Sequence, residues 1–125
     1  MGQNIEQDES IRPWGHYDVL LDEAYCKVKR IVVKPGARLS YQYHKHRQEA
    51  WTVVQGVARV TLNDVDRDFK VGETAIIGLG DKHRMANPSD IDDMILIEVQ
   101  NGTYFGEDDI VRIEDDYKRA FGQAN

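Results

Sequence analysis

Short stretches rich in β-branched and aromatic residues recur along the chain, and Gly, Pro, Asn and Asp stand between them. Several stretches alternate apolar and polar positions, which is the two-residue period of a half-buried strand. Strands at this spacing, with turn residues between them, are typical of an all-β sandwich or barrel. We therefore predict strands over residues 17–21, 24–33, 38–44, 50–54, 57–62, 67–71, 74–77, 83–86 and 94–100.

The two ends of the chain differ from this pattern. Residues 1–10 are polar and acidic and lack the basic start and apolar stretch of a secretory signal, so we expect a flexible leader there. Residues 114–121 begin with acidic and end with basic side chains, which suits the dipole of a short helix. The sequence thus predicts a single domain over residues 11–125 with a short C-terminal helix.

The composition narrows the class of protein. A chain of 125 residues, 41% hydrophobic and 30% charged, fits one soluble globular domain. Its longest apolar runs, of three or four residues, are too short to span a membrane. A formal net charge of −6 argues against nucleic acid or an anionic membrane as a partner. Cys26 is the only cysteine, so no internal disulfide can form, and we expect a reducing, cytoplasmic location.

Candidate metal ligands gather in two segments. Gln42, His44 and His46 are two residues apart, so on a strand their side chains would share one face. Glu49 follows, and His83 lies in a second, glycine-rich segment. An amide oxygen, imidazoles and a carboxylate together suit one divalent ion such as Zn, Mn, Co or Fe. The alternative is that these histidines are structural or face the solvent.

The glycines around these residues complete a longer pattern. The spacing of the first cupin signature, G-x5-H-x-H-x4-E-x6-G, is found at Gly36, Gln42, His44, Glu49 and Gly56. The spacing of the second, G-x5-P-x-G-x2-H-x3-N, is found at Gly72, Gly78, Gly80, His83 and Asn87. Gln42 replaces a histidine and Gly78 replaces the proline. The chain thus resembles a cupin, which implies a double-stranded β-helix, or jelly-roll sandwich, with a metal in its mouth.

A closer resemblance extends over about residues 12–119. The C-terminal domain of type II mannose-6-phosphate isomerases has similar runs to Arg12-Pro13-Trp14-Gly15, Lys34-Pro35-Gly36, His46-Arg47, Asn87-Pro88 and residues 97–102 and 106–112. It implies isomerisation of mannose 6-phosphate and fructose 6-phosphate through an enediol, and the metal ligands Gln42, His44, Glu49 and His83. The chain departs from the family pattern at Lys45, Ala50, Gly78 and Lys118. These departures bear on the identity of the substrate more than on the fold.

Further residues are candidates for catalysis and substrate binding. The resemblance favours Arg112 as an active-site residue, and His46, Lys29 and Glu98 are other candidates for proton transfer. Arg38 and Ser40 have the parity of Gln42 and are expected to face the cavity. Arg84, like Lys29 and Arg112, is a candidate partner for a phosphate, which arginine binds with two hydrogen bonds. Residues 107–109 are expected to form an exposed acidic turn, although the resemblance also favours a structural role for them near the cavity.

Two other classes of function stay open at this point. One is a metal cupin with different chemistry, such as an epimerase, another sugar isomerase or a dioxygenase. The other is a non-catalytic cupin that binds a sugar. In the leading interpretation the partner is a small sugar phosphate, the metal leaves below about pH 6 as the histidines protonate, and a homodimer is possible through edge strands.

Overall fold

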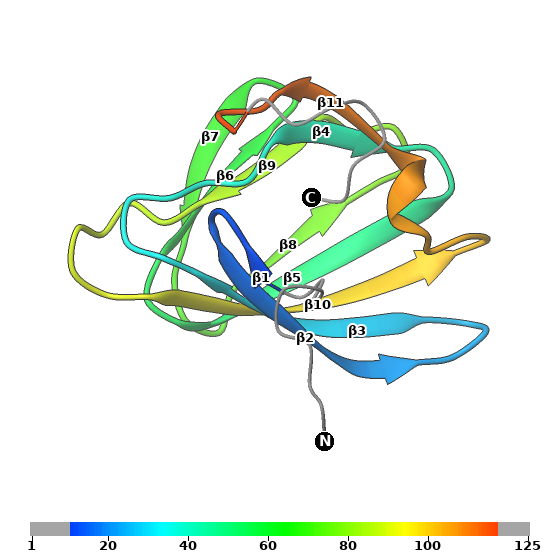
Figure 1. The fold of residues 1–125 in the computed structure, drawn as a ribbon, viewed down its shortest axis with the longest axis horizontal. Helices are drawn as coiled ribbons and strands as arrows, with labels where there is room; N and C mark the ends of the chain where they lie inside the picture. The colour runs from blue at the N-terminus through cyan, green and yellow to red at the C-terminus, as the bar shows by residue number, and fades with distance from the viewer. Residues whose placement is uncertain (1–10, 118–125) are drawn as a thin grey trace, which may run out of the picture.

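A computed structural model describes residues 11–117, which form two antiparallel β-sheets packed face to face (Figure 1). The first sheet has six strands in the order β1 (Ile11–Arg12), β2 (Gly15–Asp22), β3 (Lys27–Val33), β10 (Met94–Gly102), β5 (Arg47–Gln55) and β8 (Thr74–Ile77). The second has five, in the order β11 (Ile110–Glu114), β4 (Tyr41–His44), β9 (His83–Ala86), β6 (Ala58–Leu62) and β7 (Val65–Phe69).

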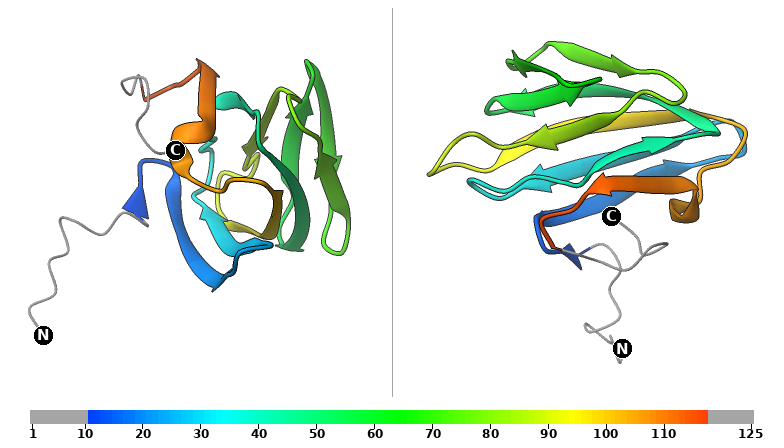
Figure 2. Two further views of the ribbon diagram at one scale, coloured as in Figure 1. Left: turned by 90° about the vertical axis from the view of Figure 1, so that its right-hand side faces the viewer. Right: turned by 90° about the horizontal axis from the view of Figure 1, so that it is seen from above.

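Strands that are adjacent in the sheets are often distant in the sequence. The central strand β10 pairs with β3 on one side and with β5 on the other. In Figure 2 the β6–β7 hairpin lies on one side of the molecule, while β2 and β11 lie on the other. This topology confirms the predicted all-β, double-sheet cupin fold.

The two-residue period of the strands builds the interior. Along β5 the buried residues alternate with more exposed ones, so Arg47, Glu49, Trp51 and Val53 all face inward. The apolar members of this row join Trp14, Leu96, Met85 and other buried residues in one hydrophobic cluster. The polar members, Arg47 and Glu49, face the same interior and therefore have to be paired there.

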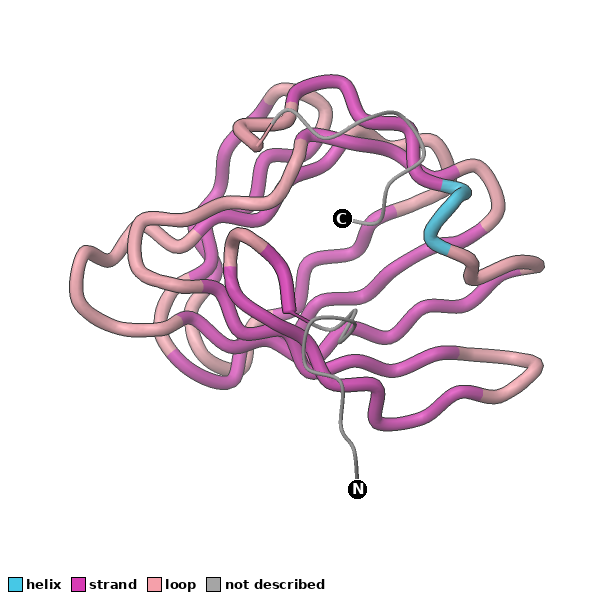
Figure 3. Tube along the Cα trace, viewed as in Figure 1, coloured by secondary structure: helices cyan, strands magenta, loops and turns pink. Residues whose placement is uncertain are grey.

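Several predicted boundaries differ from the structure. The strand expected over residues 38–44 begins only at Tyr41, and residues 45–46 form a bend between β4 and β5. The predicted C-terminal helix is wrong for residues 114–117, which end β11 and form a turn, and residues 118–121 lie outside the described residues. In residues 11–117 the helical element is a single 3-10 turn at Glu107–Asp109 (Figure 3).

The ends of the chain are not covered by the structure. The leader predicted for residues 1–10 lies outside the described residues, so the leader and the full extent of the domain to residue 125 remain predictions. None of the described segments is a helix long and apolar enough to cross a membrane.

Candidate metal centre and cavity

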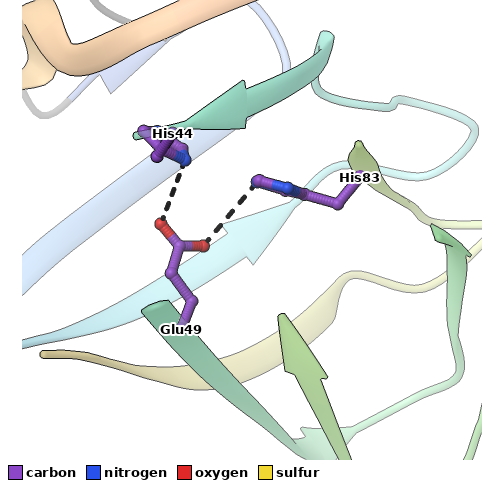
Figure 4. A group of neighbouring side chains, drawn as sticks. All are labelled: His44, Glu49 and His83. Atoms are coloured by element: carbon purple, nitrogen blue, oxygen red, sulfur yellow. Dashed lines mark ion pairs between the residues drawn. The ribbon is translucent and has the colours of Figure 1, made fainter. Parts of the chain in front are cut away.

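Three buried side chains from three strands converge between the sheets. His44 ends β4, Glu49 lies on β5 and His83 begins β9. Their candidate ligand atoms all lie within 4.8 Å of one another. His44 Nδ1 is 3.7 Å from Glu49 Oε2, and His83 Nε2 is 4.0 Å from Glu49 Oε1 (Figure 4). The fold thus gathers three residues of the sequence signatures at one point.

The two imidazoles are in the form that a metal requires. Burial lowers the pKa of His44 from 6.5 to about 4, and burial also lowers the pKa of His83. Both rings are therefore neutral at pH 7. The buried Nδ1 and Nε2 atoms of His44 have no hydrogen-bond partner among residues 11–117. Buried polar atoms are normally paired, so these nitrogens fit a ligand that residues 11–117 do not supply.

Glu49 provides the negative charge of this group. Its Oε2 accepts a hydrogen bond from Arg47 Nε at 2.8 Å, and its Oε1 accepts one from Trp51 Nε1 at 2.9 Å. Burial alone would raise the pKa of Glu49, but the Arg47 charge and the neighbouring histidines outweigh it and hold the pKa well below its ordinary range. Two neutral imidazoles and a carboxylate fit a borderline divalent ion such as zinc.

Gln42 lies beside this cluster, on the inward face of β4. It is directly opposite His83 in the β4–β9 pairing and is buried. Its Nε2 donates to the hydroxyl of Ser40 at 2.9 Å and to the carbonyl of Ser40 at 3.2 Å. The amide oxygen is therefore the atom of Gln42 that suits a cation. Ser40, expected to contact substrate, instead holds this amide.

A cavity opens beside the candidate metal ligands and is lined by charged side chains. Lys29 Nζ and Arg47 Nη1 both contact Glu107 Oε2, at 3.3 and 3.2 Å. Lys29 also lies over the ring of Tyr17, 4.1 Å from its centroid. The remaining polar side chains of the lining are those of Trp14, Gln42, Glu49, Trp51, His83, Arg84 and Glu98. The cavity thus brings the candidate ligands Gln42, Glu49 and His83 together with cations that a phosphate or another anion could contact.

Glu98 is the second buried carboxyl of the cavity. Burial and the nearby charge of Glu49 raise the pKa of Glu98 to about 8. It accepts hydrogen bonds from Trp51 Nε1 at 3.1 Å and from Gln100 Nε2 at 2.5 Å. Because Trp51 donates to both Glu49 and Glu98, one indole joins the charged carboxylate to the protonated carboxyl.

The sequence did not single out Arg47, Glu107 or Asp109. Arg47 could have been found from the two-residue period of β5, because it shares the inward face of Glu49 and Trp51. The expected acidic turn at residues 107–109 is present, but only Asp108 is exposed. Asp109 is buried, and its carboxylate accepts hydrogen bonds from the backbone N–H groups of Lys45 and His46.

Two expected cavity residues face elsewhere. His46 lies in the bend after β4, so it does not share the face of Gln42 and His44; its side chain is 56% exposed and bonds Asp109 at 2.8 Å. Arg38 precedes β4 and is also exposed. It forms a two-pronged ion pair with Asp116, at 2.6 and 2.8 Å. The parity argument was wrong at both positions because neither residue belongs to the strand.

The other two arginines proposed as phosphate partners, Arg84 and Arg112, lie on the second sheet. Arg84 lines the cavity and donates to the Leu39 carbonyl at 2.8 Å. Arg112 is opposite Gln42 in the β11–β4 pairing, so it shares the inward face of that residue, and its side chain is 7% exposed. Strand β11 therefore holds Arg112 beside the candidate ligands.

The burial of His44 makes the stability of the metal-free protein depend on pH. In the folded protein the His44 ring gains its proton near pH 4, and not near pH 6 as the sequence alone would suggest. Between these pH values the unfolded chain binds a proton at residue 44 more readily than the folded chain does. The stability contributed by the neutral ring is complete above pH 6.5 and is lost as the pH falls toward 4, a change of about 3 kcal/mol.

Glu98 acts in the opposite direction, because its raised pKa favours the folded state as the pH falls below 8. The test therefore compares the free energy of unfolding of metal-free wild type with that of His44→Asn, in which Glu98 is retained. We expect the difference to shrink by about 3 kcal/mol between pH 7 and pH 4. A difference that does not vary with pH would contradict the buried, neutral state of His44.

Solved structures with the same fold include proteins with little sequence similarity. An uncharacterised conserved protein with a double-stranded β-helix domain from Klebsiella pneumoniae superposes with a TM-score of 0.71 at 26% identity, covering 86% of this chain and 94% of that one. KdgF from Halomonas sp. superposes with a TM-score of 0.70 at 17% identity, covering 82% and 92%. The second likeness shows the fold alone.

Curated relatives are much closer in sequence. Over 111 residues the chain is 49% identical to the alginate biosynthesis protein AlgA of Pseudomonas aeruginosa and 49% identical to the mannose-1-phosphate guanylyltransferase ManC of Salmonella typhimurium. Each alignment covers 89% of this chain but 23% of the relative, so the chain spans about a quarter of their length. Residues 3–115 match the family described as mannose-6-phosphate isomerase C-terminal, and the chain belongs to this family.

Proposed function

We propose that this domain is a metal-dependent aldose–ketose isomerase that interconverts mannose 6-phosphate and fructose 6-phosphate. One observation carries the proposal: His44, Glu49 and His83 lie beside two cations, Lys29 and Arg47, which share the carboxylate of Glu107. The chain also belongs to the mannose-6-phosphate isomerase C-terminal family. A sugar phosphate needs both parts, because its carbonyl end is polarised during the reaction while its phosphate carries negative charge.

In this proposal, one group of residues binds the metal and another binds the substrate. His44, Glu49, His83 and the amide oxygen of Gln42 would hold one divalent ion, Zn, Mn, Co or Fe. When bound, such an ion supplies Lewis acidity toward the oxygens of the substrate. Arg47 would contact the anionic part of the substrate, and Arg84 and Arg112 add positive charge on the facing sheet.

The reaction moves a proton from C2 to C1 through an enediol, with a matching proton shift between the two oxygens, and it needs no external oxidant or reductant. The transferring group must reach the substrate from inside the cavity. Lys29 and Glu98 line the cavity and are directly opposite each other in the β3–β10 pairing. We assign the proton transfer to this pair, with the carboxylate form of Glu98 accepting the C2 proton and returning it to C1, and not to His46, which faces the solvent.

The test combines metal analysis with NMR of mannose 6-phosphate in heavy water. We expect bound divalent metal, formation of fructose 6-phosphate, and deuterium at C2 of the mannose 6-phosphate recovered after reversal. Removing the metal with a chelator should lower turnover at least a hundredfold, and added Mn, Co or Zn should restore it. Undiminished turnover in verified metal-free protein would overturn the mechanism.

The same experiment separates the other classes of function. Bound metal without isomerisation or exchange would favour a cupin of different chemistry, such as an epimerase or a dioxygenase. Absence of both metal and turnover would favour a domain that only binds a sugar.

A further inference from the structure

The ring of His83 is oriented by a backbone carbonyl. His83 Nδ1 lies 2.8 Å from the carbonyl oxygen of Asp81. A carbonyl oxygen can only accept, so this hydrogen bond requires the proton on Nδ1. The other nitrogen, Nε2, then carries a lone pair, and it is the nitrogen that points toward Glu49 (Figure 4). The position of the Asp81 carbonyl therefore selects the tautomer that can bind a metal through Nε2.

The segment that carries this carbonyl is held by the tip of the β6–β7 hairpin. Asn63 Nδ2 donates to Asp81 Oδ1 at 3.1 Å, and Asn63 Oδ1 accepts from the Lys82 N–H at 3.0 Å. The Asn63 N–H donates to the Lys82 carbonyl at 2.7 Å. Asp81 Oδ2 also accepts from the Gly78 N–H at 2.8 Å, a bond that a proline at position 78 could not make. Asn63 thus contacts residues 81 and 82 with both ends of its amide.

The same tip also reaches the strand that carries Gln42 and His44. The Tyr41 hydroxyl donates to Asp64 Oδ1 at 2.6 Å and accepts from the Asp64 N–H at 2.8 Å. Within the described residues, the ladder between β4 and β9 consists of one pair, Gln42 and His83. Backbone hydrogen bonds from Leu39 N to Met85 O and from Gly80 N to His44 O also join the two segments, and the hairpin tip adds a side-chain connection between them near the metal cluster.

The turn conformation does not itself require asparagine. Asn63 and Asp64 have φ values of 48° and 72°, in the left-handed region that glycine adopts more readily than any other residue. A glycine at position 63 would suit the turn backbone. The amide side chain of Asn63 is therefore separable from the shape of the hairpin, which makes its role testable.

We propose that Asn63 is a positioning residue for the metal centre. Through Asp81 and Lys82 it keeps the Asp81 carbonyl where it holds the proton on His83 Nδ1, and it thereby raises the metal affinity of the cluster. The part of the inference that concerns affinity rests on the proposed metal site. The part that concerns the tautomer of His83 does not.

The first test is a titration of the metal-free protein with Co²⁺, followed by the visible absorption of the bound ion. Asn63→Gly removes the amide and suits the turn, and we expect it to bind Co²⁺ about 10- to 100-fold more weakly than wild type. The matched control is Thr61→Val in the same hairpin, which removes the exposed hydrogen bond to Asp66. We expect Thr61→Val to bind as wild type does. Equal affinity of Asn63→Gly and wild type, or equal losses in the two variants, would overturn the proposal.

The second test needs no metal and no activity. Long-range ¹⁵N–¹H NMR of the metal-free wild type should show the His83 proton on Nδ1, whereas in Asn63→Gly a population with the proton on Nε2 should appear. A wild-type ring protonated on Nε2 would overturn the proposal even if Asn63→Gly fails to fold. An unchanged tautomer in a folded Asn63→Gly would do the same. If the tautomer shifts as expected but wild type binds no Co²⁺, the proposed metal function fails while the role of Asn63 in orienting His83 stands.

Discussion

The His44→Ala variant should lose its metal and its isomerase activity, while His46→Ala should keep both. His44 is 3% exposed and its ring nitrogens have no hydrogen-bond partner among residues 11–117, whereas the His46 ring is 56% exposed and bonds Asp109. If a divalent site of four ligands contributes at least 10 kcal/mol, each ligand accounts for roughly 3 kcal/mol. We therefore expect both metal affinity and turnover to fall at least about a hundredfold in His44→Ala.

The two substitutions form a matched pair, because they remove the same side chain from positions two residues apart. Metal content measured after dialysis against a fixed concentration of free metal gives the affinity, and NMR of mannose 6-phosphate gives the turnover. Circular dichroism of the metal-free variants shows whether each one folds. The ligand assignment is wrong if folded His44→Ala retains its metal. If His46→Ala loses as much metal affinity and turnover as His44→Ala, then His46 does not face the solvent in the active protein.

The strand pattern predicted an all-β sandwich or barrel because that information is local, whereas the double-sheet cupin fold was implied by the resemblance to the two signatures. The two-residue alternation marks strands, and the glycines of the two signatures mark the turns between them. The same signatures indicated which histidines and which glutamate would lie together. In the structure the candidate ligand atoms of His44, Glu49 and His83 lie within 4.8 Å of one another. Strand parity failed at His46 and Arg38 because both lie just outside β4, where the alternation of side chains no longer holds.

The residues that sequence reasoning missed contact partners that are distant in the sequence. Glu107 is 60 residues from Arg47 and 78 from Lys29, and Asn63 is 18 from Asp81. None of these pairs follows from a strand period or a short motif, because each depends on how the two sheets and their loops come together. An acidic run such as residues 107–109 looks like solvated surface until the partners that face it are known.

These distant contacts produce a buried network with balanced charge. Arg47 bonds Glu49 on one side and Glu107 on the other, and Lys29 shares the carboxylate of Glu107. Burial alone would raise the pKa of Glu107, but Lys29 and Arg47 outweigh it and lower the pKa. Arg47 likewise lowers the pKa of the candidate ligand Glu49, which stays charged while Arg47 is beside it. A cupin interior that carries this many charges depends on the pairing of each one.

Arg47→Met should consequently be among the most destabilising single changes in this domain, at about 3 to 5 kcal/mol in the free energy of unfolding of the metal-free protein. Methionine fills much of the arginine volume, so the loss comes chiefly from leaving Glu49 and Glu107 without their shared cation. The control is Arg30→Met, which breaks the two hydrogen bonds from Arg30 to Asp18 at 2.7 and 2.9 Å. That pair has side chains 50% and 40% exposed, whereas Arg47 is 4% exposed, so its loss should cost no more than about 1 kcal/mol.

Urea denaturation of the two metal-free variants and the wild type at pH 7 measures both values. The variant Arg47→Met/Glu107→Gln tests this cause, since it removes one of the two carboxylates that lose Arg47 as a partner. It should recover part of the lost stability if unpaired buried charge is the cause. If Arg47→Met costs no more than Arg30→Met, the network does not stabilise the interior. If the double variant is less stable than Arg47→Met alone, Glu107 contributes through contacts other than its bond to Arg47, of which its pair with Lys29 is the one that the structure shows.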